Sequence, residues 1–427
     1  MEKAPARHGQ ARRRPQGSPL FEEFYRAQRI VPEAEWPAFL AALKTSLPAC
    51  FRVTAGRYAD QIRAKLGEPD AWALAGLEVD DGAEGASFAV RPPAPVDWLP
   101  EGYAWSINAP RPVLRKCPQL KAFQQWLVAE NGAGNINRQE VRRPGALCAR
   151  GLPRSDRATA GPQAVSMIPP LLLDVKPGMS VLESVQQLSC QLALNTILTK
   201  LLLLCSLCAA PGSKTAQLVD LVQGGQPHAR DRGLVVANDV DTSRCYMLVH
   251  QLKRFSGDSI MVTNHPAQAF PLMRRHGDGG SAGGRGLQFD RVLCDVPCTG
   301  DGTIRKSPDI WHKWKPANGL SLHKLQLSIL IRGVELCAVG GRIVYSTCSF
   351  NPYENEAVVA AAVRRFNGKL VVCDVAGELP NLKRSHGLRC DRCTLCPGHA
   401  SALTAFRSLG QHVASARTGA RLVRSRG

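Results

Sequence analysis

From residue 164 onward, short apolar runs alternate with amphipathic stretches. Runs rich in Val, Ile and Leu predict strands, whereas apolar residues that recur every three or four positions predict helices. Strands are expected at residues 180–182, 233–238, 259–263, 289–294 and 341–346, and helices at 215–222, 243–255 and 320–338. Strands separated by helices pair in parallel through right-handed crossovers. The pattern therefore predicts an α/β fold with a doubly wound, Rossmann-like sheet, whose ligands bind at the carboxyl ends of the strands.

The rest of the chain divides by composition. Residues 1–18 are polar and basic and are expected to form a disordered tail, and residues 19–140 form a small accessory region that begins with two short helices, bounded by Pro32 and Pro48. Residues 141–163 carry five arginines and no apolar period, which is typical of an unstructured insert. We expect the α/β domain to span residues 164–376 and a divergent basic tail to follow at 377–427.

Charge and cysteine content narrow the class of protein. The net charge of +19 favours a polyanionic partner such as nucleic acid, although part of it lies in terminal arginine runs that solvated tails would also explain. The 15 cysteines are irregularly spaced and no secretory leader is evident, so we expect a reducing compartment rather than a disulfide scaffold. The apolar stretch at 192–208 is short and interrupted by polar residues, which argues against a membrane span.

A turn of small residues precedes the first predicted helix of the α/β domain. Small side chains let a ligand approach the backbone, and the free amides of a helix start favour an anionic group, although a plain tight turn would read the same way. Asp239 ends the second strand, where an acidic side chain can bind ribose hydroxyls in such folds. The residues of this turn are Cys208, Ala209, Ala210, Pro211, Gly212, Ser213, Lys214 and Thr215.

Two further turns follow the fourth and fifth strands. Asp295 and Cys298 lie in the first turn and Cys348 in the second, so all three are expected at the same edge of the sheet. Buried cysteines are usually packing residues, and we interpret Cys190, Cys205, Cys245, Cys337 and Cys373 in that way. Cys298 and Cys348 differ because they stand in turns beside Pro, Gly, Ser and Thr.

The tail contains four potential metal ligands at a regular spacing of three positions. Cys390, Cys393, Cys396 and His399 would suffice for tetrahedral zinc, but the second, distant pair of usual zinc modules is missing. We therefore expect no metal.

Taken together, these motifs resemble the Sun-domain RNA cytosine-carbon-5 methyltransferases. The resemblance rests on Arg138-Gln139-Glu140, residues 164–170, the turn at 208–215, the turn at 295–302 and Thr347-Cys348-Ser349, and it extends from about Phe21 to about Leu382. Residues 21–25, 30–32, 135–140 and 238–241 are most similar to the animal branch that acts on many transfer RNAs.

The resemblance implies a cofactor, a partner and a role for each site residue. S-adenosyl-L-methionine would bind along residues 208–214, with Asp239 on its ribose and Asp295 also among its binding residues. RNA, above all tRNA, would be the substrate of a monomeric enzyme. Cys348 would attack carbon 6 of cytosine, Asp295 would hold the ring at nitrogen 3, and Cys298 would remove the proton from carbon 5. The resembled branch is nuclear, so nucleus or nucleolus is expected, with cytoplasm as the alternative.

Two inserts depart from the family pattern. Residues 184–207 separate Glu183 from the turn at Cys208, and residues 141–163 split another continuous run. A strand and its ligand loop are usually joined by roughly 2–6 residues, so an insert of this length is expected to displace the donor loop. In addition, Asn264-His265-Pro266 stands where the family has an acidic residue beside the adenine.

These departures leave two alternatives to an active RNA methyltransferase. The first is a catalytically impaired isoform that still binds RNA through its basic surface. The second is a DNA cytosine methyltransferase, which shares the chemistry but would use Cys298, after Pro297, as its nucleophile. The second cysteine, Cys348, favours the RNA enzymes.

Overall fold

The computed structural model describes residues 16–80, 87–137, 164–185, 212–224, 233–253, 255, 259–273, 286–388, 414–415 and 421–425. Several sequence-based expectations lie outside these residues. They are the tail before residue 16, the insert at 141–163, most of the insert at 184–207, the loop residues Cys208 to Pro211 and the candidate zinc ligands from Cys390 to His399.

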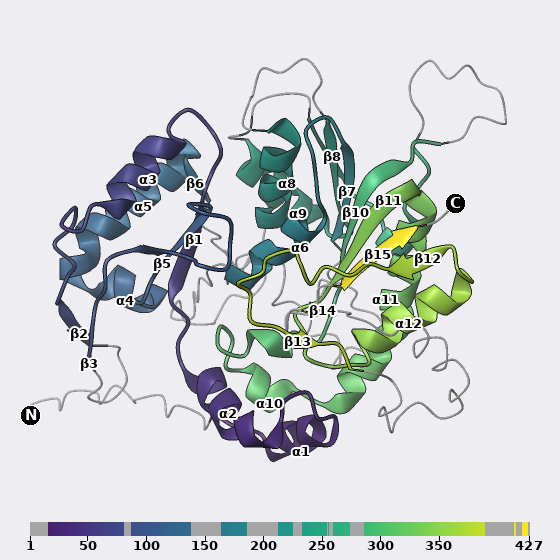
Figure 1. The fold of residues 1–427 in the computed structure, drawn as a ribbon, viewed down its shortest axis with the longest axis horizontal. Coiled ribbons are helices and arrows are strands. Elements are labelled where there is room, and N and C mark those ends of the chain that lie inside the picture. The colour runs from purple at the N-terminus through teal and green to yellow at the C-terminus, as the bar shows by residue number, and fades with distance from the viewer. Residues whose placement is uncertain are drawn as a thin grey trace, which may run out of the picture.

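A seven-stranded sheet forms the centre of the molecule (Figure 1). Its order is β12-β15-β11-β10-β7-β8-β9, and the five strands from β11 to β9 are all parallel to their neighbours. This confirms the predicted doubly wound α/β fold. The bounds are β7 (Ser180–Val185), β8 (Leu234–Asp239), β9 (Ile260–Thr263), β10 (Phe289–Asp295), β11 (Cys337–Ser346), β12 (Leu370–Val372) and β15 (Arg421–Ser425).

Helices cover both faces of this sheet because each strand is apolar on both sides. Val181 packs into one core and its neighbour Leu182 into the other, as side chains alternate along a strand. The first core involves α6 (Ile168–Leu172) and α8 (Ser213–Gln223), with α9 (Thr242–Leu252) beside them. The second involves α11 (Pro316–Leu336) and α12 (Glu356–Arg365). The helices follow the predicted stretches, within a few residues at their ends.

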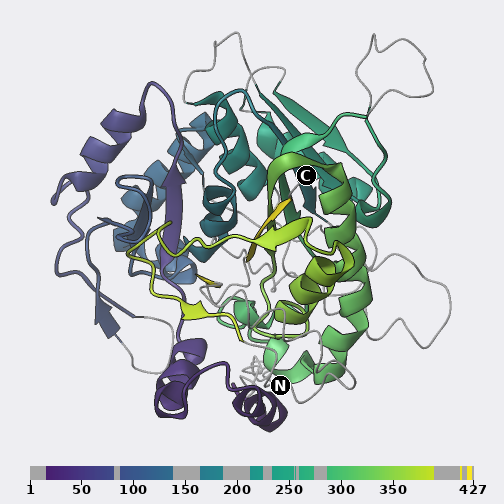
Figure 2. The ribbon, with the colours of Figure 1, turned by 45° about the vertical axis from the view of Figure 1, so that its right-hand side comes forward.

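A separate small sheet, of order β4-β5-β1-β6, stands beside the central sheet with its own helices (Figure 2). Its core includes Phe51, Trp105 and Phe123. The two short helices expected at the start of this region are present, and strand β1 and a third helix, which the sequence pattern did not predict, follow them. The elements are β1 (Ala49–Val53), α3 (Ala59–Gly67), β2 (Glu78–Asp80), β3 (Ser87–Ala89), β4 (Ala94–Pro95), β5 (Ala104–Ile107), α4 (Arg111–Lys116), α5 (Lys121–Ala133) and β6 (Ile136–Asn137).

The first two helices pack against the α/β domain rather than the small sheet. These are α1 (Pro19–Ala27) and α2 (Trp36–Lys44), which lie next to α10 (Ile310–Lys313) in Figure 1. Phe21 and Tyr25 of α1 share a buried core with Trp311 and Trp314. The amino-terminal helices thereby cover the segment that follows the turn of Cys298.

The far end of the chain also enters the central sheet. Strand β15 pairs antiparallel with β11 on one side and with β12 on the other. A short ladder joins β13 (Ser385–His386) to β14 (Ala414–Ser415). The divergent sequence after residue 377 did not predict either contribution. Among the residues that the structure describes, no helix is both long and apolar enough to cross a membrane.

Candidate active site

The acidic residues and the two turns meet at one edge of the sheet because parallel strands end together. In the register of the sheet, Asp295 stands beside Ser346 of β11 and Val185 of β7, and Val185 stands beside Asp239 of β8. The predicted convergence of Asp295 and Asp239 is therefore confirmed at the level of the backbone. This edge is where ligands bind in doubly wound sheets.

Asp295 is held on both of its oxygens. Lys214 Nζ lies 2.7 Å from Oδ2, and Ser346 Oγ donates a hydrogen bond to Oδ1 at 2.7 Å. Lys214 belongs to the first turn of α8 and Ser346 ends β11, so three elements converge on this carboxylate. The aspartate is held in one orientation, and the side chains of both residues remain partly exposed, at 14% for Lys214 and 21% for Asp295.

The two candidate cysteines lie next to each other. The Sγ atoms of Cys298 and Cys348 are 3.2 Å apart, and the amide of Cys348 donates to Cys298 Sγ at 3.3 Å. The two turns are also joined at 2.8 Å by a bond from Gly302 N to the Cys348 carbonyl, and a Cβ at Gly302 would meet that carbonyl oxygen at 2.7 Å. Only glycine allows this approach. Cys348 takes part in a disulfide bond that does not involve Cys298, so thiol chemistry at Cys348 belongs to the reduced protein.

Other cysteines have the environment of packing residues. Cys245 and Cys337 are buried and Cys373 is partly buried, as expected, while Cys190 and Cys205 lie outside the described residues. Burial raises the pKa of the Cys294 thiol to about 12, which keeps it protonated.

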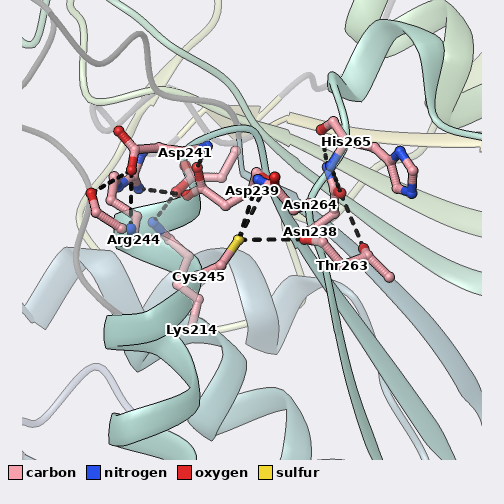
Figure 3. A network of polar contacts seen from close by, with 11 residues as sticks. Lys214, Asn238, Asp239, Asp241, Arg244, Cys245, Thr263, Asn264 and His265 are labelled. Atoms are coloured by element: carbon pink, nitrogen blue, oxygen red, sulfur yellow. Dashed lines mark hydrogen bonds and ion pairs between the residues drawn. The ribbon is translucent and has the colours of Figure 1, made fainter. Parts of the chain in front are cut away.

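Asp239 sits in a polar network at the end of β8 (Figure 3). Arg244 Nη2 lies 3.0 Å from its Oδ2, and the Asp241 amide donates to Oδ1 at 2.9 Å. Burial raises the pKa of Asp239 to about 6, and the positive charge of Arg244 acts against that rise. Sequence reasoning singled out Asp239 but missed Arg244, one turn along α9, which balances its charge.

Asn264, at the position expected to lie beside the adenine, is engaged within the same network (Figure 3). Its Nδ2 donates to the Asp239 carbonyl at 2.7 Å, and its Oδ1 accepts from Thr242 Oγ1 at 3.2 Å. Asn264 thus links the end of β9 to the start of α9.

Glu183 provides a test of whether a polar ligand fits this edge. The residue is 2% exposed, and its Oε2 is buried with no hydrogen-bond partner among the residues that the structure describes. Burial raises its pKa to about 7. A buried carboxyl oxygen without a partner is costly, and a ligand that donates a hydrogen bond or carries positive charge would relieve that cost. Glu183, Asp239 and Asp295 together fit a cationic, hydroxyl-bearing ligand.

The loop that was expected to hold the donor is described only at its end. Gly212 precedes α8 with a φ of +76°, and a Cβ there would meet Leu248 Cδ1 at 2.8 Å, so both conformation and space favour glycine. Ser213 and Lys214 open the helix. Cys208, Ala209, Ala210 and Pro211 lie outside the described residues.

Comparisons with known proteins agree with this architecture. Residues 199–402 match the family model described as 16S rRNA methyltransferase RsmB/F. The multisite-specific tRNA:(cytosine-C(5))-methyltransferase of Saccharomyces cerevisiae is 39% identical over 369 residues, which cover 86% of this chain and 46% of that protein. The tRNA (cytosine(34)-C(5))-methyltransferase of Drosophila melanogaster is 38% identical over 374 residues, which cover 86% of this chain and 43% of that protein. The chain spans less than half the length of these two relatives.

A solved structure supports the fold. The methyltransferase homolog protein from Pyrococcus horikoshii has a TM-score of 0.53 at 19% identity, covering 95% of this chain and 98% of that one. The resemblance inferred from the motifs is confirmed, since the family match includes Asp295, Cys298 and Cys348. Residues 199–402, which make up most of the α/β domain, are thus similar to the methyltransferases that the RsmB/F model describes.

Proposed function

We propose that this protein methylates carbon 5 of cytosine in RNA, with S-adenosyl-L-methionine as methyl donor and tRNA as substrate. The observation that carries the proposal is the 3.2 Å separation of the Cys298 and Cys348 sulfurs, in turns that flank the strand ends of Asp295 and Ser346. Carbon 5 of cytosine is a poor nucleophile. Chemistry there therefore requires an activating group, and a thiol can supply it by covalent catalysis.

The proposed roles follow the positions of the three side chains. The thiolate of Cys348 adds to carbon 6, which makes carbon 5 nucleophilic toward the methyl group. Asp295, oriented by Lys214 and Ser346, holds the proton that nitrogen 3 takes up as negative charge develops in the adduct, and it takes this proton back when the adduct breaks down. After methylation, Cys298 takes the proton from carbon 5 and the bond between carbon 6 and Cys348 breaks, which restores the aromatic ring.

The donor would lie at the ends of β7 and β8. When bound, S-adenosyl-L-methionine supplies a methyl group activated by a sulfonium. Asp239 would accept hydrogen bonds from its ribose, and the Glu183 oxygen that has no partner within the described part of the chain would face its polar groups. Residues 208–214 are the proposed loop around its amino-acid end, and Lys214 also holds Asp295.

The tRNA assignment rests on the relatives and on charge. The yeast and Drosophila relatives are named for tRNA, and the chain carries a net charge of +19, which suits a polyanion. A cytosine must leave its stack to reach the sheet edge, and this costs less in single-stranded or loop RNA. Location in the nucleus or nucleolus, and a monomeric state, are further proposals from the resemblance.

A second candidate function is an RNA-binding isoform without turnover. It is favoured by the 24 residues that separate Glu183 from Cys208, because a strand and its ligand loop are usually joined by roughly 2–6 residues. Calorimetric titration separates the two. Saturable binding of S-adenosyl-L-methionine supports the enzyme, whereas retained tRNA binding without donor binding supports the silent isoform.

The direct test of function is bisulfite sequencing of tRNA after incubation with the purified, reduced chain and the donor. We expect protected cytosines that depend on the donor. A Cys348→Ala variant is the matched control, and equal protection by wild type and variant would contradict the proposal.

A further inference from the structure

Two buried carboxylates outside the proposed chemistry connect the turns that carry the two cysteines. Glu354 and Asp301 are both completely buried. Neither was given a role by the sequence motifs. Buried carboxylates require several hydrogen bonds, so their partners indicate what they hold in place.

Glu354 bridges the two turns with one carboxylate. On the Cys298 side, Thr299 donates through its amide to Oε1 at 2.9 Å and through its hydroxyl to Oε2 at 2.6 Å. On the Cys348 side, Ser349 Oγ donates to Oε2 at 2.7 Å. Thr299 and Ser349 directly follow Cys298 and Cys348 in the sequence. Glu354 therefore accepts hydrogen bonds from the residue next to each cysteine.

Helix α11 also contacts the Glu354 carboxylate, in addition to the two turns. Gln326 of α11 donates to Glu354 Oε1 at 3.1 Å and to the Pro297 carbonyl at 2.7 Å. A Cβ on Gly319, in the same helix, would lie 3.1 Å from Glu354 Oε2, so the helix packs closely against the carboxylate. The position of Glu354 is thus fixed by a long helix rather than by the turns alone.

Asp301 makes a second connection between the same turns. Its Oδ1 accepts from the Phe350 amide at 2.8 Å, two residues after Cys348. Its Oδ2 accepts from Trp314 Nε1 at 2.9 Å and from the hydroxyl of Tyr25 in α1. The amino-terminal helices therefore support the site from outside.

We propose that Glu354 is a positioning residue, which sets the separation of the Cys298 and Cys348 sulfurs by holding Thr299 and Ser349 on one carboxylate. The inference rests on the proposed function, in which both sulfurs act on one cytosine ring. The four donor groups on the Glu354 carboxylate come from Thr299, Ser349 and Gln326, and because all of them donate, the ionised form suits the bridge. Burial raises the pKa of Glu354 to about 7, and the bonds from Ser349 and Thr299 act against that rise.

The first test measures geometry without turnover. The reduced full chain and its Glu354→Gln variant are treated with the thiol oxidant diamide, and the disulfide between Cys298 and Cys348 is followed by peptide mass spectrometry. Sulfurs held 3.2 Å apart should join rapidly. We expect the variant to form this bond roughly tenfold more slowly, because the turns separate when the carboxylate is lost. Equal rates would overturn the proposal.

The second test measures turnover. With Glu354→Gln we expect kcat for tRNA methylation to fall roughly 100-fold, with the KM for tRNA within about twofold, since misplacing a reacting group by about 1 Å has that cost. Glu354→Asp keeps the charge and should recover part of the loss. The matched control is Glu356→Gln. The carboxylate of Glu356 accepts from Leu388 N at 3.2 Å rather than from the residues after the cysteines, so the variant should leave kcat unchanged. A rise in KM with unchanged kcat would overturn the proposal.

The experiments also distinguish a variant that fails to fold, and a wild-type chain that has no activity, from failure of the Glu354 proposal. If Glu354→Gln does not fold, Thr299→Val removes one hydroxyl of the bridge and should still slow both disulfide formation and kcat by roughly tenfold. Unchanged rates in a folded Thr299→Val would then overturn the proposal. If the wild-type chain makes no 5-methylcytosine, the proposed function fails, while the diamide rates still decide whether Glu354 sets the separation of the sulfurs.

Discussion

Lys214 Nζ lies 2.7 Å from Asp295 Oδ2, which joins the start of the donor-side helix to the carboxylate proposed to hold cytosine. One lysine therefore stands between the two halves of the site. Its position brings the start of α8 and the end of β10 together, although Lys214 and Asp295 are 81 residues apart, so that both could act in the proposed reaction.

We expect Lys214→Met to lower kcat for cytosine methylation roughly 100-fold, the usual cost of losing one charge-assisted donor in an active site. The measurement is the rate of methyl transfer from labelled donor to tRNA at saturation. Lys313→Met is the matched control, because the Lys313 side chain is exposed and lies 3.9 Å from the exposed carboxylate of Asp309. Loss of activity in both variants alike would contradict the assigned role.

The buried ion pair of Arg52 and Asp220 joins the small sheet to the α/β domain, and we expect it to contribute strongly to stability. Their side chains are 3% and 8% exposed and form an ion pair between β1 and α8. Breaking a buried pair leaves an uncompensated charge, so Arg52→Met should lower the free energy of unfolding by about 3–5 kcal/mol. Urea denaturation measures this.

The exposed pair of Arg63 and Asp60 provides the comparison for that experiment, with side chains 37% and 97% exposed. Arg63→Met should change the free energy of unfolding by less than about 1 kcal/mol, because water screens such pairs. If both variants lowered the free energy of unfolding by similar amounts, the buried pair would not be what joins the small sheet to the α/β domain.

The raised pKa of Asp239, about 6, predicts a pH-dependent donor affinity. The ionised carboxylate is the stronger acceptor for ribose hydroxyls, and it is the dominant form above that pKa. Affinity for S-adenosyl-L-methionine should therefore hold above about pH 6 and fall toward lower pH, by at most roughly tenfold per unit. Calorimetric titration from pH 5 to 8 tests this.

Asp239→Asn should bind the donor more weakly and remove the dependence near pH 6. Burial raises the pKa of Glu183 to about 7, so a dependence on Glu183 would appear at higher pH and disappear in Glu183→Gln. A wild-type affinity that is flat from pH 5 to 8 would contradict both assignments.

The sequence was sufficient to predict those features of the fold and the site that depend on a local pattern of residues. The five parallel strands were predicted because their apolar runs are short and bounded by turns, and this alone placed Asp239 and Asp295 at one edge. Cys298 and Cys348 stood out because their neighbours are turn residues. The structure adds that their sulfurs are 3.2 Å apart.

Contacts between distant residues could not be read from such patterns. Tyr25 and Asp301 are 276 positions apart, and Arg52 and Asp220 are 168 apart. Nothing near Arg52 distinguishes it from a surface arginine. Strand β15 was missed for another reason, since its five residues carry two arginines and resemble a solvated basic tail.

The central claim is that Cys348 bonds to the cytosine ring and Cys298 releases it. Reduced Cys298→Ala, Cys348→Ala and the double variant are incubated with tRNA and S-adenosyl-L-methionine and run on denaturing gels that detect covalent protein–RNA complexes. The account predicts a complex with Cys298→Ala, which cannot remove the carbon 5 proton, and none with the other two. A complex with Cys348→Ala and none with Cys298→Ala would contradict it.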